Sequence, residues 1–393
     1  MTSSADRILT THVGSLIRPP QFVEILKLKE NGLPYDAAAY AAMLRQSVHE
    51  IVRQQAEIGI DIVSDGEFGK SNSWARYVLE RLTGFEARDI GADIDISPPK
   101  DRRDFPEFYA EYDRANGMGG MVETMAVTRP IRYAGQDLVR QDIENLKNGL
   151  NDVSVAGGFL PVVAPASVVP ERIDKFYADD EAYAFAVAEA MREEYRAIHD
   201  AGLILQIDDA YIPYNYERMV PPGTLTDYRR WATTCVEALN HALEGIPQDR
   251  VRYHICWGSW NGPHAFDVPM KDIVDLMLQV NVGAYQFEAA NPRHEHEWVV
   301  WRSVKLPPGK VLIPGVISHA TNIVEHPELV AQRIVRLAGI VGKENVMGGT
   351  DCGFAQSPFA QRVHPSIMWA KLRSLAEGAK IATRELWGQR SAA

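Results

Sequence analysis

The sequence predicts an α/β protein, a TIM (β/α)8 barrel, from three observations. Short apolar or β-branched runs alternate with longer amphipathic stretches, which is the pattern of parallel β-α-β units. About eight such units follow one another, the number found in this barrel. Several of the runs end in Gly, Asp or Ser, as strands do where a loop begins. An open doubly wound sheet is the alternative, and the absence of G-x-G-x-x-G after the first run weakens it only slightly.

The expected strands are short apolar runs, and the expected helices are longer stretches with a helical repeat of apolar residues. The strands are Ile8–Ser15, Ile60–Gly66, Phe159–Pro165, Leu203–Asp208, Val251–Cys256, Ala284–Ala289, Lys310–Ile317 and Asn345–Asp351. Between them, helices are expected over Glu181–Ala201, Leu225–Leu243, Lys271–Gln279 and Pro327–Val341. The tripeptides Asp200–Gly202 and Val341–Lys343 predict helix ends.

One segment, from about residue 83 to residue 135, interrupts the alternation. It contains Pro98, Pro99, Pro106 and the glycine-rich run Gly117–Met121. Long loops in compact domains are usually functional or mobile. We therefore predict an insertion after the second strand that acts as a lid, within a chain that otherwise forms a single barrel domain over residues 1–393.

Charge and composition exclude some functions. The formal net charge of −11 argues against a nucleic-acid surface, which usually needs a basic face. No apolar stretch is long enough for a signal peptide or a membrane span, so a cytoplasmic protein is expected. Three cysteines in a chain of this length do not make a disulfide framework, and in a reducing compartment they are more often buried, catalytic or metal-bound.

The fifth predicted strand ends in a candidate metal-binding pair. His254 and Cys256 are two residues apart, so on a strand their side chains point to the same side and can reach one ion. H-x-C alone is a weak signal, because a single buried histidine or cysteine more often belongs to the core. The pattern is stronger because two of the three cysteines lie at predicted strand ends. The third, Cys235, lies in a helical stretch and is expected in the core.

Two further candidate ligands lie at the ends of the sixth and eighth predicted strands, Glu288 and Cys352. The carboxyl ends of barrel strands converge on one face, where both could meet His254 and Cys256. Two thiolates, one imidazole and one carboxylate suit tetrahedral Zn²⁺, whereas Mg²⁺ and Ca²⁺ prefer oxygen ligands. The sequence therefore predicts a zinc site.

Other polar residues fall at comparable positions near strand ends. These are Ser15 after the first strand, Asp65 and Glu67 after the second, Asp208 and Asp209 after the fourth, and His319 after the seventh. Adjacent acids can also be solvated or cap the next helix, which we favour for Asp209. Burying several acids at one barrel mouth costs free energy unless cations compensate, and a zinc ion with an ammonium-bearing substrate would do so.

Several segments, in order, carry a resemblance to a known family. THVGS, SDGE, LQIDD, YHICWG, FEAANPRHEHEW, PGVISHATN and GTDCGF resemble the C-terminal catalytic barrel of cobalamin-independent methionine synthase, and more closely the short single-barrel members of that superfamily. The resemblance covers nearly the whole chain apart from the insertion and the tail. It implies a zinc-dependent methyltransferase of methionine biosynthesis, which transfers the methyl group of 5-methyltetrahydropteroyltriglutamate to homocysteine.

The resemblance also implies a role for each matching residue. His254, Cys256, Glu288 and Cys352 take the zinc-ligand places. Ser15 would bind the carboxylate of homocysteine, and Glu67 and Asp208 would bind its ammonium group. His319 is near the place of a histidine that helps proton transfer, although the PGVISHATN segment is shorter than in the family.

Two departures from the family concern the alkyl donor. The tryptophan-containing stretch that contacts folate has no match in Pro161–Pro170, and Asp208-Asp209-Ala210 replaces Asp-Glu-Pro. The alternative function is therefore zinc-dependent transfer of a non-folate alkyl group or an epoxide to another thiol, such as coenzyme M. Arg18 or Lys70 could supply the basic clamp that a sulfonate needs.

Two hypotheses from other classes stay open. One is a binding protein with a structural zinc, and the other is a metal-free enzyme that uses Asp65, Glu67 and Asp208 as acid–base groups. The expected partners are a small thiol and an alkyl donor, with no nucleic acid and no membrane. The sequence leaves open the donor, an acceptor beyond the preference for homocysteine, the role of the insertion, and whether the chain forms a homo-oligomer.

Overall fold

The computed structural model describes residues 4–88, 98–115, 124–174, 176–359 and 361–388, and a seven-stranded parallel sheet lies at its centre. The strand order is β1-β4-β6-β7-β8-β9-β10, and neighbours in this order are hydrogen-bonded. The strands are β1 (Ile62–Ser64), β4 (Gly157–Val163), β6 (Ile204–Asp209), β7 (Val251–Ile255), β8 (Ala284–Glu288), β9 (Val311–Ile317) and β10 (Gly349–Thr350).

The two edges of this sheet are joined by the N-terminal segment around Thr10. Thr10 forms a parallel bridge with Gly348, and the Thr11 N–H donates to the Gly348 carbonyl at 2.9 Å. On the other side, the N–H groups of Asp61 and Ile62 donate to the Thr10 carbonyl at 3.1 and 3.0 Å. The segment thus replaces the first strand with an isolated bridge, and the sheet closes into the predicted TIM barrel.

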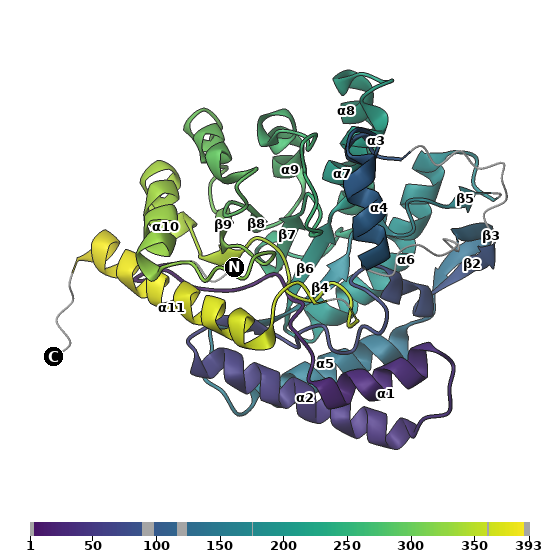
Figure 1. The fold of residues 1–393 in the computed structure, drawn as a ribbon, viewed down its shortest axis with the longest axis horizontal. Helices are drawn as coiled ribbons and strands as arrows, with labels where there is room; N and C mark the ends of the chain where they lie inside the picture. The colour runs from purple at the N-terminus through teal and green to yellow at the C-terminus, as the bar shows by residue number, and fades with distance from the viewer. Residues whose placement is uncertain (1–3, 89–97, 116–123, 175, 360, 389–393) are drawn as a thin grey trace.

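Helices pack around the sheet, as Figure 1 shows. The main ones are α1 (Pro20–Glu30), α2 (Ala37–Glu57), α5 (Gln136–Leu150), α6 (Asp180–Asp200), α7 (Tyr211–Met219), α8 (Leu225–Ala242), α9 (Val274–Gln279), α10 (Pro327–Val341) and α11 (Pro365–Trp387). Short 3-10 helices are η1 (Arg76–Glu80), η2 (Pro165–Ser167), η3 (Gln248–Arg250), η4 (Met270–Asp272), η5 (Glu295–Arg302) and η6 (Lys343–Asn345).

Local sequence signals explain several helix boundaries. The Asp36 side chain accepts the N–H groups of two residues in the first turn of α2, and Thr224 forms a capping box with Asp227 at the start of α8. The expected helix over Lys271–Gln279 is instead divided into η4 and the short α9. The division occurs because Ile273, with φ −132°, leaves the helical conformation between them.

The segment predicted as an insertion contributes two of the three strands of a second, smaller sheet. Within it, β2 (Leu82–Arg88) pairs antiparallel with β3 (Thr124–Tyr133), which also pairs with β5 (Ile173–Asp174). Between β2 and β3, α3 (Lys100–Asp104) and α4 (Pro106–Ala115) lie beside α7 (Figure 1). The run Gly117–Met121 lies outside the described residues, and a lid function of the segment remains a prediction.

The barrel interior changes from apolar to polar toward the carboxyl ends of the strands. The apolar layer consists of Leu9, Ile62, Phe159, Ile204, Ala284, Val311, Ile313 and Met347. Above it, the buried Arg252 lies 3.6 Å from the centre of the Phe159 ring and donates to Gln206 Oε1 at 2.6 Å. Burial lowers the pKa of Arg252 to about 9. Because β7 side chains alternate in direction, His254 and Cys256 continue the Arg252 row toward the mouth of the barrel.

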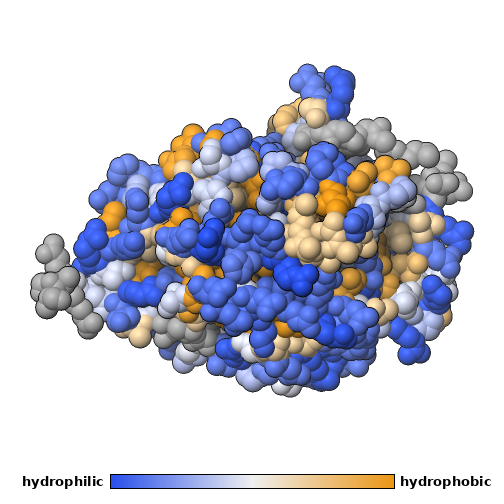
Figure 2. Space-filling model, turned by 90° about the horizontal axis from the view of Figure 1, so that it is seen from below, coloured by the Kyte–Doolittle hydropathy of each residue, from blue (hydrophilic) through white to orange (hydrophobic). Residues whose placement is uncertain are grey.

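The surface seen from below in Figure 2 is mainly hydrophilic, with apolar residues scattered between the polar ones in small groups. None of the described helices is both long and apolar enough to cross a membrane.

Candidate metal centre

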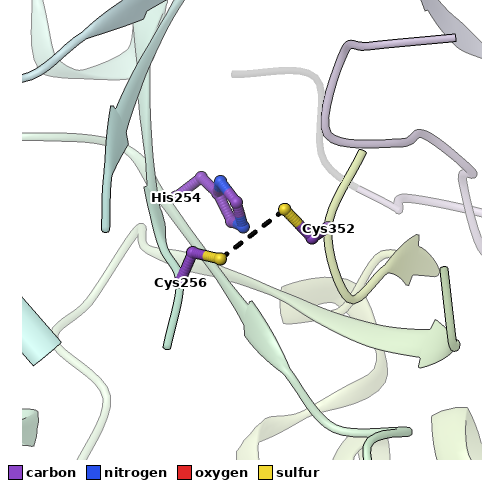
Figure 3. A group of neighbouring side chains, drawn as sticks. All are labelled: His254, Cys256 and Cys352. Atoms are coloured by element: carbon purple, nitrogen blue, oxygen red, sulfur yellow. Dashed lines mark hydrogen bonds between the residues drawn. The ribbon is translucent and has the colours of Figure 1, made fainter. Parts of the chain in front are cut away.

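Three of the four predicted metal ligands meet where β7 and β10 end. The ligand atoms of His254, Cys256 and Cys352 lie within 4.8 Å of one another, and all three residues are buried. The two sulfur atoms are 3.5 Å apart, and Figure 3 shows a ring nitrogen of His254 turned toward the line that joins them. One imidazole and two sulfurs are ligands that zinc prefers, so this cluster could hold a metal ion.

The hydrogen bonds of the cluster distribute its protons unequally. Cys256 Sγ donates to Cys352 Sγ, which lowers the pKa of the Cys352 thiol and raises that of Cys256. Burial lowers the pKa of His254, but the hydrogen bond to Asp208 and the nearby Cys352 outweigh it and bring the value to about 9. Cys352 is therefore the more acidic of the two thiols, and it lies beside the His254 ring. A divalent cation could replace the protons on His254 and Cys256, as metal binding to such ligands requires.

Glu288, the fourth predicted ligand, lies beside this cluster and outside the 4.8 Å group. Its Oε1 is 3.7 Å from Cys256 Sγ and accepts the Trp257 N–H at 3.1 Å. Its Oε2 accepts a hydrogen bond from Asn291 Nδ2 at 2.9 Å. The carboxylate is thus positioned by two donors next to one sulfur atom.

Two aspartates orient the elements that carry the ligands. Asp208 Oδ1 accepts hydrogen bonds from His254 Nδ1 at 3.1 Å and from Gln206 Nε2 at 2.7 Å. A carboxylate at Nδ1 would make Nε2 the metal-binding nitrogen, and this atom lies 3.2 Å from the Asp351 carbonyl oxygen. Asp351 accepts the N–H groups of Ala289 and Ala290 at 2.8 and 2.9 Å, which fixes the turn after Glu288.

Ser15 and Glu67, predicted to bind substrate, line the same cavity as the metal cluster. Glu67 has φ +60°, a conformation that residues other than glycine adopt rarely, and its N–H donates to Asp65 Oδ1 at 2.9 Å. Its Oε2 lies 3.2 Å from Lys70 Nζ, and both side chains are buried. Arg18 donates to the backbone carbonyls of Glu67 and Lys70. Glu67 thus already has an ammonium partner from the chain itself.

His319 follows β9 and is buried close to the metal cluster. Burial lowers its pKa to about 3, and the positive charge of Arg362 acts in the same direction, so the imidazole is uncharged at neutral pH. His319 is absent from the described residues that line the cavity, whereas Ser259 and Arg362 are among them. The predicted proton-transfer residue therefore lies behind the cavity wall.

A cavity of about 580 Å³ extends from the cluster, a volume typical of small-molecule sites. Its inner end is formed by strand-end residues, including Ser15, Glu67, Asp208, His254, Cys256 and Cys352. Its outer end contains what we call the aromatic wall, which consists of Tyr109, Tyr112, Tyr211, Tyr214 and Trp260. The cavity therefore joins a polar, metal-binding end to an aromatic end.

Sequence analysis missed most of this wall. Trp260 lies in the segment Gly258–Asp267, which could be expected as a loop over the metal, and Tyr211 and Tyr214 follow the Asp208–Asp209 strand end. Position after a strand end was thus the one available signal for these residues. Tyr109 and Tyr112 lie on α4 in the insertion, where no sequence pattern indicated a site.

A second buried cluster lies among the loops over this end of the barrel. Asp267 accepts hydrogen bonds from His264 Nδ1 at 3.1 Å and from His294 Nε2 at 2.9 Å, and Glu297 accepts one from His294 Nδ1 at 2.8 Å. The His264 ring stacks on Trp260, with centroids 4.2 Å apart. His294 is buried, unlike the neighbouring His296, which is exposed. We call His264, Asp267, His294 and Glu297 the His–acid network.

The chain is similar in sequence to several known proteins over most of its length. No family model matches the chain. It is 26% identical to the uncharacterized protein YxjH of Bacillus subtilis over 381 residues, which cover 93% of this chain and 92% of the relative. It is 25% identical to the 2-hydroxypropyl-CoM lyase of Xanthobacter autotrophicus, with 89% and 88% covered. It is 22% identical to a methionine synthase of Thermococcus kodakarensis, with 96% and 94% covered.

Solved structures show the same fold. A B12-independent methionine synthase from a Shewanella species, in complex with selenomethionine, superposes with a TM-score of 0.72 at 19% identity, covering 98% of this chain and all of the other. A putative B12-independent methionine synthase from Listeria monocytogenes gives 0.66 at 20% identity, with 98% and 100% covered. The homologues of this chain are thus methionine synthase-like proteins, and they include enzymes.

Proposed function

We propose that this chain, a homologue of cobalamin-independent methionine synthase-like proteins, is a zinc-dependent enzyme that transfers an alkyl group to a small thiol. The first reaction to test is methyl transfer to homocysteine. The observation that carries the proposal is the His254–Cys256–Cys352 cluster, which lines a cavity of about 580 Å³. A purely structural site would have no use for such a cavity beside its sulfur ligands.

The ligand set of the proposal is His254, Cys256 and Cys352, with Glu288 as the fourth and exchangeable member. Zinc bound there would lower the pKa of an acceptor thiol, so that a thiolate exists at neutral pH. Glu288 is the ligand that suits exchange, because a carboxylate is harder than a thiolate and lies 3.7 Å from Cys256 Sγ. Its two hydrogen-bond donors would hold it close while the acceptor sulfur takes its place.

The remaining residues would orient the acceptor and move protons. Ser15 would bind the carboxylate of an amino-acid thiol, and Asp208 and Glu67 would face its ammonium group. The thiolate sulfur then attacks the donor carbon, a carbon–sulfur bond forms, and the electron pair of the broken bond leaves with the donor atom. We assign proton transfer to that atom to His319. Because burial keeps this imidazole uncharged, it would relay a proton rather than store one.

One contact favours a second candidate, alkyl transfer to a thiol that carries a sulfonate. The ammonium group of Lys70 lies 3.2 Å from the Glu67 carboxylate, so the carboxylate that was expected to bind the substrate's ammonium group is already in an ion pair. A homologue is named 2-hydroxypropyl-CoM lyase. Substitution Glu67→Gln would free Lys70, which should weaken binding of homocysteine and strengthen binding of coenzyme M. Equal weakening of both acceptors would reject this candidate.

Zinc X-ray absorption with and without homocysteine tests the proposed function directly. We expect one additional sulfur neighbour around zinc when the thiol is added, and one fewer oxygen neighbour. A zinc environment that stays the same would favour the structural-zinc hypothesis instead. Purified protein without any bound zinc after growth in zinc-supplemented medium would favour the metal-free acid–base hypothesis.

A further inference from the structure

The aromatic wall at the outer end of the cavity indicates which class of alkyl donor could bind there, whereas the metal centre does not. The aromatic wall is continuous: Trp260 Nε1 donates to the Tyr109 hydroxyl at 3.0 Å, and the Tyr214 and Trp260 rings meet edge-on with centroids 5.7 Å apart. Tyr211 lies against Tyr214, and Tyr112 against Tyr109, at 6.2 and 6.3 Å. Such a surface binds flat or apolar groups by stacking and burial.

The insertion helps to build this wall and is held in place by a buried acid. Asp101, on α3, is 1% exposed and accepts hydrogen bonds from the Ala265 N–H at 3.1 Å and the Tyr109 hydroxyl at 3.4 Å. Its own N–H donates to Glu217 Oε2 at 3.0 Å. One residue thus ties the insertion, the loop after β7 and α7 together, which fixes three parts of the wall relative to one another.

The charges around the cavity are unfavourable for a polyanion. The described lining residues include four carboxylates, Glu67, Asp208, Asp209 and Glu217, but only two arginines, Arg102 and Arg362, and no lysine; the third basic side chain, His254, belongs to the metal cluster. A ligand with several carboxylates needs unpaired basic groups, because each of its charges must otherwise be left unpaired or in water.

Both arginine side chains already have partners. Arg102 forms two hydrogen bonds with Asp113, at 2.7 and 3.0 Å, and lies over the Tyr109 ring at 4.4 Å. Arg362 Nη1 donates to the Tyr112 hydroxyl at 2.9 Å. Segments 89–97 and 116–123 of the insertion, whatever their position, contain no Lys or Arg. Arg362 Nε has no hydrogen-bond partner within the described part of the chain, so one anionic group could be held there, but not a chain of them.

From this arrangement we propose that the donor is recognised by an uncharged flat or apolar group against the aromatic wall, and that a polyanionic tail adds nothing to its binding. The inference rests on the proposed function and specifies the donor class for it. If the donor is a methylated tetrahydrofolate, the pterin ring is the group that binds, and the number of glutamates has no effect. A small uncharged donor such as an epoxide meets the same requirement.

The experiment compares 5-methyltetrahydrofolate carrying one or three glutamates, and a short epoxide, as donors for zinc-loaded protein with homocysteine and coenzyme M. We expect the two folates to differ in KM by less than about threefold, and little change between low and high salt. A preference of tenfold or more for the triglutamate, lost at high salt and abolished by Arg362→Gln, would overturn the inference while leaving the proposed function standing.

Variants of α7 supply matched controls. Tyr214→Leu removes a ring of the wall and should raise the donor KM about tenfold without changing the acceptor KM. Tyr214→Phe keeps the ring and should restore the donor KM. Tyr216→Leu removes a ring on the same helix that packs on Tyr228, at 5.2 Å, and is absent from the cavity lining, so it should leave the donor KM unchanged. An equal effect of Tyr214→Leu and Tyr216→Leu would contradict a donor site at the wall.

Binding calorimetry separates this inference from the proposed function. Unmethylated tetrahydrofolate is titrated into wild-type and Tyr214→Leu protein, and no turnover is required. The proposed function is rejected if none of the donors supports alkyl transfer and the added thiol does not bind zinc. If tetrahydrofolate does not bind and the epoxide is not a donor, the aromatic wall is rejected as a donor site, whatever the outcome for the proposed function.

Discussion

Two buried clusters that contain histidine lie near the mouth of this barrel, and they differ in whether their residues line the cavity. In the His–acid network, both nitrogens of His264 and both of His294 have oxygen partners within 3.3 Å. In the metal cluster, both nitrogens of His254 also have oxygen partners, at 3.1 and 3.2 Å, but all three candidate ligands line the cavity. The His–acid network is thus absent from the described lining of the cavity, whereas the metal cluster presents two sulfur atoms and an imidazole to it.

The comparison shows that burial and shifted pKa values do not by themselves mark a functional site. His294 is as strongly perturbed as His254: burial lowers its pKa, but hydrogen bonds to Asp267 and Glu297 raise it to about 10. The difference lies in what each histidine faces. His294 lies between two carboxylates and on the Trp257 ring, with centroids 4.4 Å apart, while His254 faces two sulfurs and the cavity.

The largest effect should come from removing a sulfur ligand. We expect Cys352→Ala or Cys256→Ala to lose most bound zinc and nearly all turnover, because neither a closed ligand set nor an activated thiol remains. Metal analysis of purified protein measures the first loss. The unfolding temperature of the metal-free variants should stay near that of metal-free wild type, and full zinc content in either variant would refute the site.

Disrupting the His–acid network should lower the stability of the fold and leave the zinc content unchanged. We expect His294→Gln to reduce the free energy of unfolding at pH 7 by about 3 kcal/mol, since it leaves buried carboxylates without their cation. Its zinc content should equal that of wild type. Denaturant unfolding with parallel metal analysis measures both quantities. If the variant loses zinc but keeps its stability, the His–acid network is part of the metal site, and the separation of the two clusters is wrong.

The network should also make stability depend on pH. The pKa of His294 is raised from 6.5 to about 10 in the folded protein, so its contribution is complete below pH 6.5 and is lost as pH rises through 10. Wild-type stability should therefore decline between pH 7 and pH 10. Thermal unfolding across this range should show a shallower decline for His294→Gln, and parallel curves for the two proteins would contradict the assignment.

A smaller effect is expected from Asp208→Asn, which tests how the metal cluster depends on its surroundings. The amide can no longer fix the His254 ring as a carboxylate does, and loss of such a partner typically costs 10–100-fold in metal affinity, roughly. Competition with a zinc chelator measures this change. An amino-acid thiol should lose more affinity than coenzyme M, because Asp208 would also face the ammonium group.

The smallest effect is expected from the third cysteine. Cys235 is buried in α8 among apolar residues, 5% exposed, and burial raises its pKa well above the ordinary value. Cys235→Ala should keep zinc and turnover and cost on the order of 1 kcal/mol of stability, the usual cost of a small change in the core. Loss of zinc in this variant would mean that cysteine substitutions act on the fold rather than on the cluster.

The same contrast explains what the sequence could predict. The metal cluster lies on strand ends, where a spacing of two residues fixes side-chain direction and the barrel brings the ends together, so His254, Cys256 and Cys352 could be placed before any coordinates were known. The eight strand positions were predicted for the same reason. The first of them, around Thr10, forms only a bridge, because hydrogen-bonded pairing to its neighbours depends on contacts that a local pattern does not encode.

The outer end of the cavity could not be predicted in this way. Tyr109 and Tyr112 reach the site from an insertion whose position depends on Asp101, and no repeat in the sequence indicates that contact. The Glu67–Lys70 pair was missed for a related reason. Both residues were recognised separately, but the left-handed backbone at Glu67 that brings them together is a property of the folded turn.

The seam that closes the barrel has a consequence for biosynthesis. The Thr10 segment is synthesised long before the Gly348 segment with which it pairs. The Phe354 N–H likewise donates to the Ser15 carbonyl at 2.8 Å, so two segments far apart in the sequence meet beside Cys352. A nascent chain therefore cannot bring His254, Cys256 and Cys352 together before Cys352 itself has been synthesised.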